Sequence, residues 1–269
     1  MHGDVEVDEP EGDSRDGRRS SLERWHALSR AQRGLATAVG AAVVAAVGWG
    51  VNAGMPKLVD WVNGPEDTPV ATRLLIVDTS REMNESLGGR SKFAAVKSQI
   101  AALVQRTPDV AFALRTVGGG CVESGYQEPD VKFASRDGAE IVSELAKAHV
   151  GGRADIPTAV SYGTNDFQRF KIARSARIQS IWLFIGGARD TCEPEAPPLG
   201  PALKLALIDS PAKVSYVDLF VLRGDKKGYA NLRKSVESLG STFAVSRVAT
   251  EAGLRNAVQR ASRRESASQ

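Results

Sequence analysis

Few side chains in this sequence could carry out chemistry. A nucleophilic enzyme needs a Ser or Cys beside a base and a third group that orients the base, but no Gly-x-Ser-x-Gly motif occurs. His2 and His26 lie near the N-terminus, which leaves His149 as the one histidine for the folded part. Two cysteines and one distant histidine also make a poor zinc site. The remaining candidates are Asp78 and Glu82, which could act as paired carboxylates.

The charge of the chain argues against a nucleic-acid partner. Its 269 residues include 35 Lys and Arg and 32 Asp and Glu, and the formal net charge of +3 is spread along the chain. A nucleic-acid-binding domain usually collects its basic residues into one field. The average apolar and charged fractions are those of a folded protein, so we expect one main domain with appendages.

Apolar residues alternate between strand-like and helix-like spacing from Leu74 onward. Leu74 to Val77 is an unbroken apolar run, typical of a strand buried on both faces, and Asp78 follows it. Further strands are predicted at 110–114, 180–185, 214–222 and 242–245, and helices at 93–104, 141–145, 156–173, 229–239 and 251–262, with a Pro-rich loop after 180–185. Strands that alternate with helices imply right-handed crossovers. We therefore expect an α/β fold with a doubly wound, mostly parallel sheet flanked by helices.

An uncharged segment, 34–56, is long enough to cross a bilayer as one helix. Trp49 and Trp61 suit the aromatic belt at the membrane interface. A cleaved signal peptide is the alternative, because Val51 and Ala53 give a small-residue cleavage pattern, and cleavage would yield a secreted protein. The charged stretch before the apolar run is longer than a usual signal-peptide n-region. We therefore expect an uncleaved, single-pass transmembrane helix.

Arginines concentrate on the N-terminal side of this segment, which predicts a cytoplasmic N-terminus and an extracytoplasmic C-terminal domain. They are Arg15, Arg18, Arg19, Arg24, Arg30 and Arg33. The first residues are polar and charged with almost nothing apolar, so they are expected to be disordered. The predicted organisation is a cytoplasmic disordered tail at 1–33, the transmembrane helix at 34–56, a linker at 57–72, the main domain at 73–262 and a disordered C-terminal tail at 263–269.

Several segments resemble, in the same order, the elements of a von Willebrand factor type A (vWA) domain. The segment LLIVDTSREM resembles its first strand and its Asp-x-Ser-x-Ser loop, and SKFAAVKSQIAALVQ resembles its first helix. The segment DVAFALRTVGGG resembles its second strand, and SIWLFIGGARDTC resembles the strand that usually ends in Asp-Gly. The following strand, helix and strand are similar to VSYVDLFVLRGDKKGYANLRKSVESLGSTFAV. The resemblance spans roughly residues 73 to 262. It implies a fold that is used mainly to bind other macromolecules.

The resemblance also implies a Mg²⁺ or Mn²⁺ ion at the carboxyl ends of the strands, and here the sequence departs from the family. Asp78 and Ser80 match the first two ligands, but Glu82 stands where a second Ser belongs. Gly186 stands where the fourth strand usually ends in Asp, and Ala154 falls at the expected Thr. Mg²⁺ prefers near-octahedral oxygen ligands, so the loss of two or three contacts predicts a degenerate site and no metal cofactor.

Two alternatives for this site remain open. A slip of the later loop could bring Thr158 forward as the missing hydroxyl, and Asp155 or Asp190 could join Asp78 and Glu82 in a rearranged Mg²⁺ or Mn²⁺ site. Without an ion, Asp78 is expected to accept hydrogen bonds from loop backbone N–H groups, and Ser80 to cap the turn into the helix.

The only two cysteines, Cys121 and Cys192, are predicted to form a disulfide. An even number of cysteines in an oxidising compartment favours pairing. Each also follows a predicted strand, and the loops that follow parallel strands emerge at the same edge of the sheet. The bridge would hold rigid the edge beside the metal-like site, next to the segment EPEAPPLGP.

The sequence therefore favours a non-catalytic, membrane-anchored, extracytoplasmic vWA-like interaction module that binds a protein or a cell-envelope ligand. Its candidate ligand-binding residues are Asp78, Ser80, Glu82, Asp155 and Asp190. The alternatives are a single-pass sensor that transmits ligand binding to the Arg-rich tail, or metal-dependent adhesion through the rearranged site.

Overall fold

The computed structural model describes residues 69–121, 126–134, 138–188, 192, 198–210, 212, 214–224 and 226–267. These residues belong to one compact unit. The predicted tail and membrane span, and all of the predicted linker but its last four residues, lie outside the described ranges. No helix within those ranges is both long enough and apolar enough to cross a membrane.

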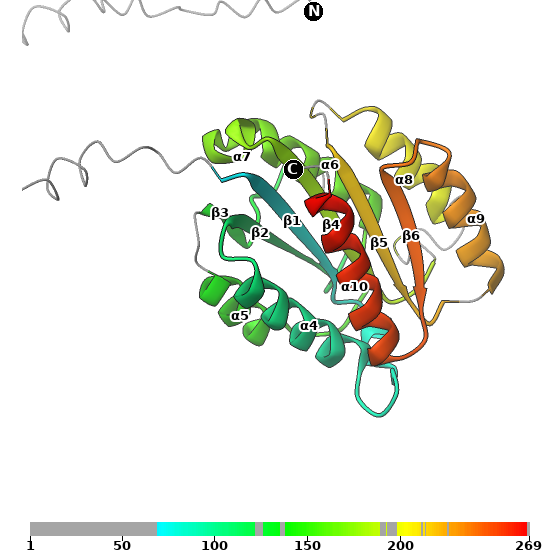
Figure 1. Ribbon diagram of the computed structural model, residues 1–269. Helices are drawn as coiled ribbons and strands as arrows, with labels where there is room; N and C mark the ends of the chain where they lie inside the picture. The colour runs from blue at the N-terminus through cyan, green and yellow to red at the C-terminus, as the bar shows by residue number, and fades with distance from the viewer. Residues whose placement is uncertain are drawn as a thin grey trace, which may run out of the picture. The chain divides into compact units, whose positions relative to one another are not determined.

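Six strands of the described chain form one sheet in the order β3-β2-β1-β4-β5-β6 (Figure 1). They are β1 (Ala71–Asp78), β2 (Val110–Val117), β3 (Val131–Ala134), β4 (Ile178–Ile185), β5 (Tyr216–Leu222) and β6 (Phe243–Val248). All neighbouring pairs are parallel except β2 and β3, which are antiparallel. The prediction of an α/β fold with a mostly parallel sheet is confirmed.

The central strand β1 is buried along its whole length. Successive side chains of a strand point to opposite faces. Leu74 and Ile76 accordingly belong to one hydrophobic core, and Leu75 and Val77 to the other. A strand buried on both faces has no room for polar side chains at these positions, which explains the unbroken apolar run in the sequence.

Helices cover both faces of the sheet. On the face of Leu74 and Ile76 the core includes α6 (Ile156–Arg169), α7 (Lys171–Ser175), α8 (Leu199–Ile208) and α9 (Lys226–Glu237). On the face of Leu75 and Val77 it includes α4 (Lys92–Arg106), α5 (Gly138–Lys147) and α10 (Glu251–Ser266), and Figure 1 shows these three helices in front of the sheet. A short 3-10 helix, η1 (Arg81–Asn84), follows β1.

Helix α8 lies where the sequence predicted the end of a Pro-rich loop. Proline is tolerated in the first turn of a helix, because its missing N–H has no intrahelical partner there. Leu199 and Leu203, one helical turn apart, are both fully buried. Gly200 brings α8 close to α9, since a Cβ atom at Gly200 would lie 2.8 Å from Oγ of Ser235. The Pro-rich loop predicted after 180–185 therefore contains a helix, and the prediction of a loop was wrong over 199–208.

Three further features of the secondary structure differ from the prediction. The edge strand β3 was missed, because it is only four residues long and its pairing with β2 is irregular. The predicted helix at 156–173 is two helices, since Phe170 adopts an extended conformation between α6 and α7. Helix α10 continues to Ser266, so residues 263–266 belong to the domain rather than to a C-terminal tail.

A buried ion pair explains why α10 continues beyond residue 262. The Glu265 carboxylate, 2% exposed, accepts hydrogen bonds from the guanidinium of Arg73 in β1 and from Nε1 of Trp182 in β4, the latter at 2.6 Å. The Arg73 guanidinium also lies over the Trp182 ring, 4.0 Å from its centroid. The last turn of α10 is therefore fixed to the centre of the sheet.

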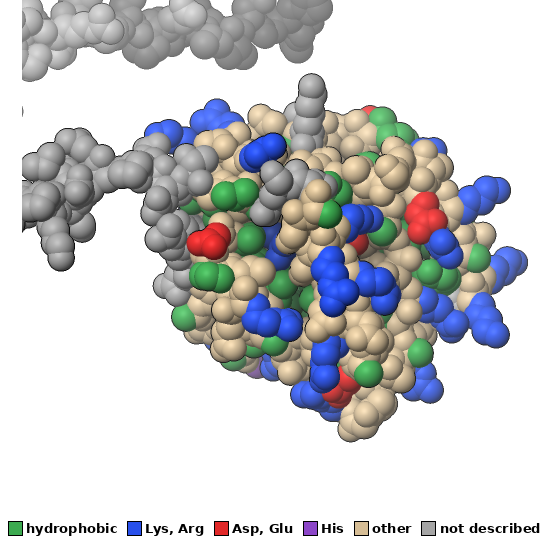
Figure 2. Space-filling view, viewed as in Figure 1, with side chains coloured by type: hydrophobic (Ala, Val, Ile, Leu, Met, Phe, Trp, Pro, Cys, Tyr) green, Lys and Arg blue, Asp and Glu red, His purple; other side chains and the backbone are tan. Residues whose placement is uncertain are grey.

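A second ionic contact joins α10 to β5. Nη2 of Arg264 donates to Oδ2 of Asp218 at 2.8 Å. Burial raises the pKa of Asp218 to about 6, although the positive charge of Arg264 acts in the opposite direction. The outer face of α10 carries the exposed residues Arg255, Arg260 and Arg263, and Figure 2 shows Lys and Arg side chains gathered over this helix.

Candidate functional site

The candidate site lies at the carboxyl ends of β1 and β4. The strand order reverses between these two neighbours, because β2 follows β1 on one side and β5 follows β4 on the other. Open α/β sheets bind their ligands at such switch points. The residues that meet here come from the loop after β1, the loop after β2, the loop before α6 and the loop after β4.

Asp78, the last residue of β1, is 4% exposed and both of its carboxylate oxygens accept backbone hydrogen bonds. Oδ1 accepts from the N–H of Ser80 at 2.7 Å, and Oδ2 accepts from the N–H of Gly186 at 2.8 Å. Burial raises the pKa of Asp78, while these hydrogen bonds and the positive charge of Lys92 act to lower it. The prediction that Asp78 accepts loop N–H groups is confirmed.

Ser80 was predicted to cap the turn that follows β1, and it is the N-cap residue of η1, although not through its side chain. Its side chain makes no capping hydrogen bond to η1. The hydroxyl is buried and lies close enough to Asp78 to lower the pKa of that carboxyl. No described residue, however, forms a hydrogen bond of good geometry with it. Ser80 acts at the turn through its main chain: its N–H donates to Asp78, and its carbonyl oxygen accepts from the N–H of Met83 at 3.0 Å.

Glu82 lies against the two glycines that follow β4. A Cβ atom at Gly186 would be 2.9 Å from Cβ of Glu82 and 3.1 Å from Oδ2 of Asp78. A Cβ atom at Gly187 would be only 2.2 Å from Oε2 of Glu82. The Glu82 side chain thus takes the space that side chains at these positions would need. The two departures from the family pattern, Glu82 and Gly186, are sterically coupled.

Lys92, the first residue of α4, places a buried ammonium group beside Asp78. The residue is 1% exposed. Its Nζ donates to the carbonyl oxygen of Gly186 at 2.7 Å and to Oε2 of Glu85 at 2.7 Å. The sequence did not single out this lysine, because at the start of a helix with a polar face a lysine usually points into solvent.

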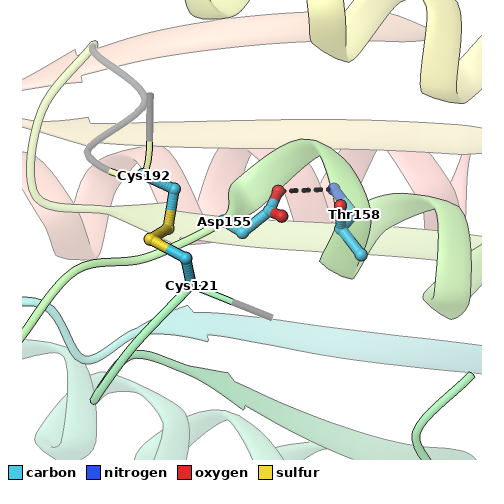
Figure 3. Close-up of a disulfide and its surroundings, with 4 residues drawn as sticks. All are labelled: Cys121, Asp155, Thr158 and Cys192. Atoms are coloured by element: carbon cyan, nitrogen blue, oxygen red, sulfur yellow. Dashed lines mark hydrogen bonds between the residues drawn. A yellow bond between two sulfur atoms is a disulfide. The ribbon is translucent and has the colours of Figure 1, made fainter. Parts of the chain in front are cut away.

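Asp155 is the N-cap residue of α6. Among the described residues, no hydrogen bond joins it to Asp78. Its Oδ1 accepts from the backbone N–H of Thr158 at 3.0 Å, the usual contact of a helix N-cap (Figure 3). Thr158 is accordingly in the first turn of α6, and Ala154 before it is buried. Asp190 lies outside the described residues.

The described chain contains no group of three His, Cys, Asp or Glu side chains that could hold a metal ion. Of the ligands that the vWA resemblance implies, Asp78 and Ser80 are in place. The position at the end of β4 has no side chain, and Glu82 occupies the space in which one would lie.

Backbone hydrogen bonds join the loops of this edge to one another. The N–H of Thr79 donates to Val117 O at 2.7 Å, and Thr79 O accepts from the N–H of Gly151 at 2.8 Å. The N–H of Gly119 donates to Gly151 O at 3.0 Å. Three loops from distant parts of the sequence are thereby linked directly through their main chains.

Two glycines permit this close contact. A Cβ atom at Gly118 would lie 2.2 Å from Oγ1 of Thr79, and one at Gly152 would lie 2.7 Å from the carbonyl carbon of Gly119. Gly152 also has a positive φ of 66°, which favours glycine. Side chains at these positions would push the loops apart.

A disulfide joins Cys121, after β2, to Cys192, after β4 (Figure 3). The two Cα atoms are 5.3 Å apart, within the usual range for a disulfide. The predicted pairing is confirmed. It links two loops whose parent strands flank β1, so it spans the same edge as the backbone hydrogen bonds.

Beyond Cys121, a cluster around Asp166 of α6 fixes the chain again. The Asp166 carboxylate accepts from the Tyr126 hydroxyl and from Nε and Nη2 of Arg115, the last two at 2.6 and 2.8 Å. Nη2 of Arg115 also donates to Gln127 O at 2.7 Å. Burial and the hydrogen bond to Asp166 raise the pKa of Tyr126 to about 12. The loop is therefore anchored on both sides of residues 122–125.

Comparisons with solved structures identify the architecture. The PilB minor pilin from Streptococcus sanguinis matches 71% of this chain and 60% of its own at 11% identity, with a TM-score of 0.55. The SpRpn10 VWA domain matches 71% of this chain and 95% of its own at 15% identity, with a TM-score of 0.51. The chain has a vWA-like fold. The von Willebrand factor type A protein from Catenulispora acidiphila gives 20% identity over 71% of this chain and 42% of its own, with a TM-score of 0.51.

These similarities concern the fold of the vWA-like domain. No protein-family model and no curated protein sequence matches the chain. The domain also spans only part of some structures that it resembles, 60% of the PilB chain and 42% of the Catenulispora chain.

Proposed function

We propose that this protein is a non-catalytic, membrane-anchored interaction module whose extracytoplasmic vWA-like domain binds a protein or cell-envelope ligand at the loop edge beside Asp78. The observation that carries the proposal is the construction of that edge. Main-chain hydrogen bonds join the loops after β1, after β2 and before α6, and the Cys121–Cys192 disulfide and close glycine contacts add the loop after β4. A surface that is rigid before binding loses less conformational entropy when its partner docks.

The fold comparisons support an interaction role. One of the similar structures is a minor pilin, and two others are vWA domains. That this chain binds its partner through the loop edge beside Asp78 is part of the proposal. We further propose that this binding needs no divalent cation, because Glu82 and Gly186 stand at two of the positions where the resemblance implies ligands, and Glu82 fills the space beside Gly186.

The extracytoplasmic location rests on two observations. The uncharged segment at 34–56 follows a cluster of arginines, which favours a cytoplasmic N-terminus. The disulfide lies in the domain that follows this segment, and structural disulfides persist mainly in oxidising compartments.

Site-specific photo-crosslinking in intact cells tests the binding edge. A photoreactive amino acid at Arg81, which is exposed beside Asp78, should capture the partner, and mass spectrometry of the product identifies it. The same amino acid at Asp109, which is exposed before β2 at the opposite edge of the sheet, is the matched control. Capture from Asp109 with none from Arg81 would place the binding surface elsewhere.

A second experiment tests the topology. Protease added to spheroplasts should digest the domain after Asp60 and leave an epitope in residues 1–33 intact. A protected domain with a digested tail would reverse the proposed orientation. Replacement of Arg24, Arg30 and Arg33 by Glu should weaken the orientation bias, because these charges lie nearest the apolar segment.

A further inference from the structure

The buried side chain of Lys92 is unusual for a lysine. Lysine side chains are almost never fully buried unless they are paired, since the ammonium group loses its hydration. Lys92 is 1% exposed and is among the largest fully buried side chains of the described domain. By contrast Lys97, five residues later on α4, is half-buried and places its ammonium over the Phe93 ring.

The contacts of Lys92 connect it to Asp78 through one residue. Nζ of Lys92 donates to the carbonyl oxygen of Gly186, and the N–H of Gly186 donates to Oδ2 of Asp78. Gly186 thus lies between a buried cation and a buried carboxylate and is hydrogen-bonded to both. The Lys92 ammonium also pairs with Glu85, whose side chain is 60% exposed. Its inner contact therefore stabilises the ends of β1 and β4, and its outer contact reaches the surface.

We propose that the Lys92 ammonium is a built-in cation that takes the place of a divalent ion at the carboxyl ends of β1 and β4. It balances the buried Asp78 carboxylate and, by holding the Gly186 carbonyl, fixes the end of β4 next to the loop after β1. Lys92 is thus a positioning residue. This inference rests on the proposed function, because it explains how the binding edge is assembled without a metal.

The same charge makes the edge unfavourable for a divalent cation. Two cations close together in a poorly hydrated site repel strongly, because the effective dielectric constant there is far below that of water. Both oxygens of Asp78 are already hydrogen-bonded, and Glu82 lies across Gly186 and Gly187. Removal of the Lys92 charge alone would leave the Asp78 and Glu85 carboxylates without this cation.

Manganese binding by the full-length protein tests the proposal. Mn²⁺ is titrated into wild type, Lys92→Met and Lys97→Met, and free Mn²⁺ is followed by electron paramagnetic resonance. We expect Lys92→Met to bind one Mn²⁺ at least tenfold more tightly than wild type, and Asp78→Asn in the same background to abolish this binding. Lys97→Met removes an equal charge from the same helix and should behave like wild type. Any Mn²⁺ bound by the acidic N-terminal residues is the same in all variants and cancels in the comparison.

Two outcomes would overturn the proposal. One is equal Mn²⁺ affinity in Lys92→Met and Lys97→Met, and the other is a saturable Mn²⁺ site in wild type that Asp78→Asn removes. Should Lys92→Met fail to fold, Lys92→Gln keeps a hydrogen-bond donor for Gly186 and removes the charge, and it takes the same place in the comparison. The experiment involves no partner, so its failure is distinguishable from failure of the crosslinking at Arg81.

Discussion

The backbone N–H of Gly186 donates to the Asp78 carboxylate at 2.8 Å, which joins the end of β4 directly to the end of β1. The two residues lie 108 positions apart in the sequence. The contact crosses the point at which the strand order reverses, where an open α/β sheet has its natural binding edge. A glycine is required here because Glu82 lies on its other side.

We predict that Gly186→Asp, which introduces the residue usual in the vWA family, destabilises the domain. The new side chain would meet Cβ of Glu82 and the Asp78 carboxylate, so overpacking alone should cost roughly 1–3 kcal/mol of unfolding free energy. Urea denaturation measures this cost. Gly120→Asp, at the same edge but with open space around its Cβ position, is the control and should cost much less.

The steric coupling of Glu82 and Gly186 can be measured by a double-mutant cycle. Glu82→Gly removes the Cβ atom that a side chain at Gly186 would meet at 2.9 Å, so Glu82→Gly combined with Gly186→Asp should recover part of the stability that Gly186→Asp loses. We expect a coupling of about 1 kcal/mol or more between these contacting positions. Strictly additive effects would contradict the assignment of Glu82 to that space.

Removal of the disulfide should lower stability without changing the fold. Cys121 and Cys192 close a loop with a sequence separation of 71, so the chain-entropy model gives a loss on the order of 4 kcal/mol in the double Ser variant. Chemical denaturation with and without a reductant measures it. The reductant should lower the stability of wild type and leave the double variant unchanged. Two free thiols in the exported protein, seen by mass spectrometry of non-reduced peptides, would contradict the pairing.

The buried pair of Arg73 and Glu265 should make α10 sensitive to a single substitution. Arg73→Met leaves the Glu265 carboxylate buried without its cation, which should cost roughly 3–5 kcal/mol of unfolding free energy. Adding Glu265→Gln removes the uncompensated charge and keeps an acceptor for Trp182, so the double variant should be more stable than Arg73→Met. Urea unfolding curves of the three proteins decide this, and a double variant no more stable than Arg73→Met would contradict it.

Asp218 should give the domain a stability component that falls as the pH rises. Burial raises its pKa in the folded state to about 6 from an ordinary value of 3.8, so the folded state binds the proton more tightly than the unfolded chain. The component is fully present below about pH 4 and is lost as the pH rises through about 6. Its size is roughly 3 kcal/mol, from about 1.4 kcal/mol per pKa unit.

Melting curves from pH 4 to 8 test this component by comparison of variants. Asp218→Asn should lack it, so the stability difference between wild type and variant should change between pH 4 and pH 7. Asp109→Asn, at an exposed position, should follow wild type throughout. A constant difference between Asp218→Asn and wild type across this range would argue against a raised pKa.

Some features of the domain were determined by the sequence alone. The run from Leu74 to Val77 predicted a central buried strand, because a strand covered on both faces excludes polar side chains. The pairing of Cys121 with Cys192 followed from two strands whose trailing loops share one edge. The first depends on the spacing of apolar residues in one segment, and the second on the number of cysteines and the order of the elements along the chain.

Other features were decided only by the tertiary structure. Lys92 and the end of α10 have no distinctive local pattern, and their surroundings come from segments far away in the chain. Lys92 contacts a carbonyl 94 positions later, and Glu265 pairs with an arginine 192 positions earlier. Burial and pairing of a charged side chain depend on such distant partners, because only the folded sheet brings the partners together and excludes water from between them.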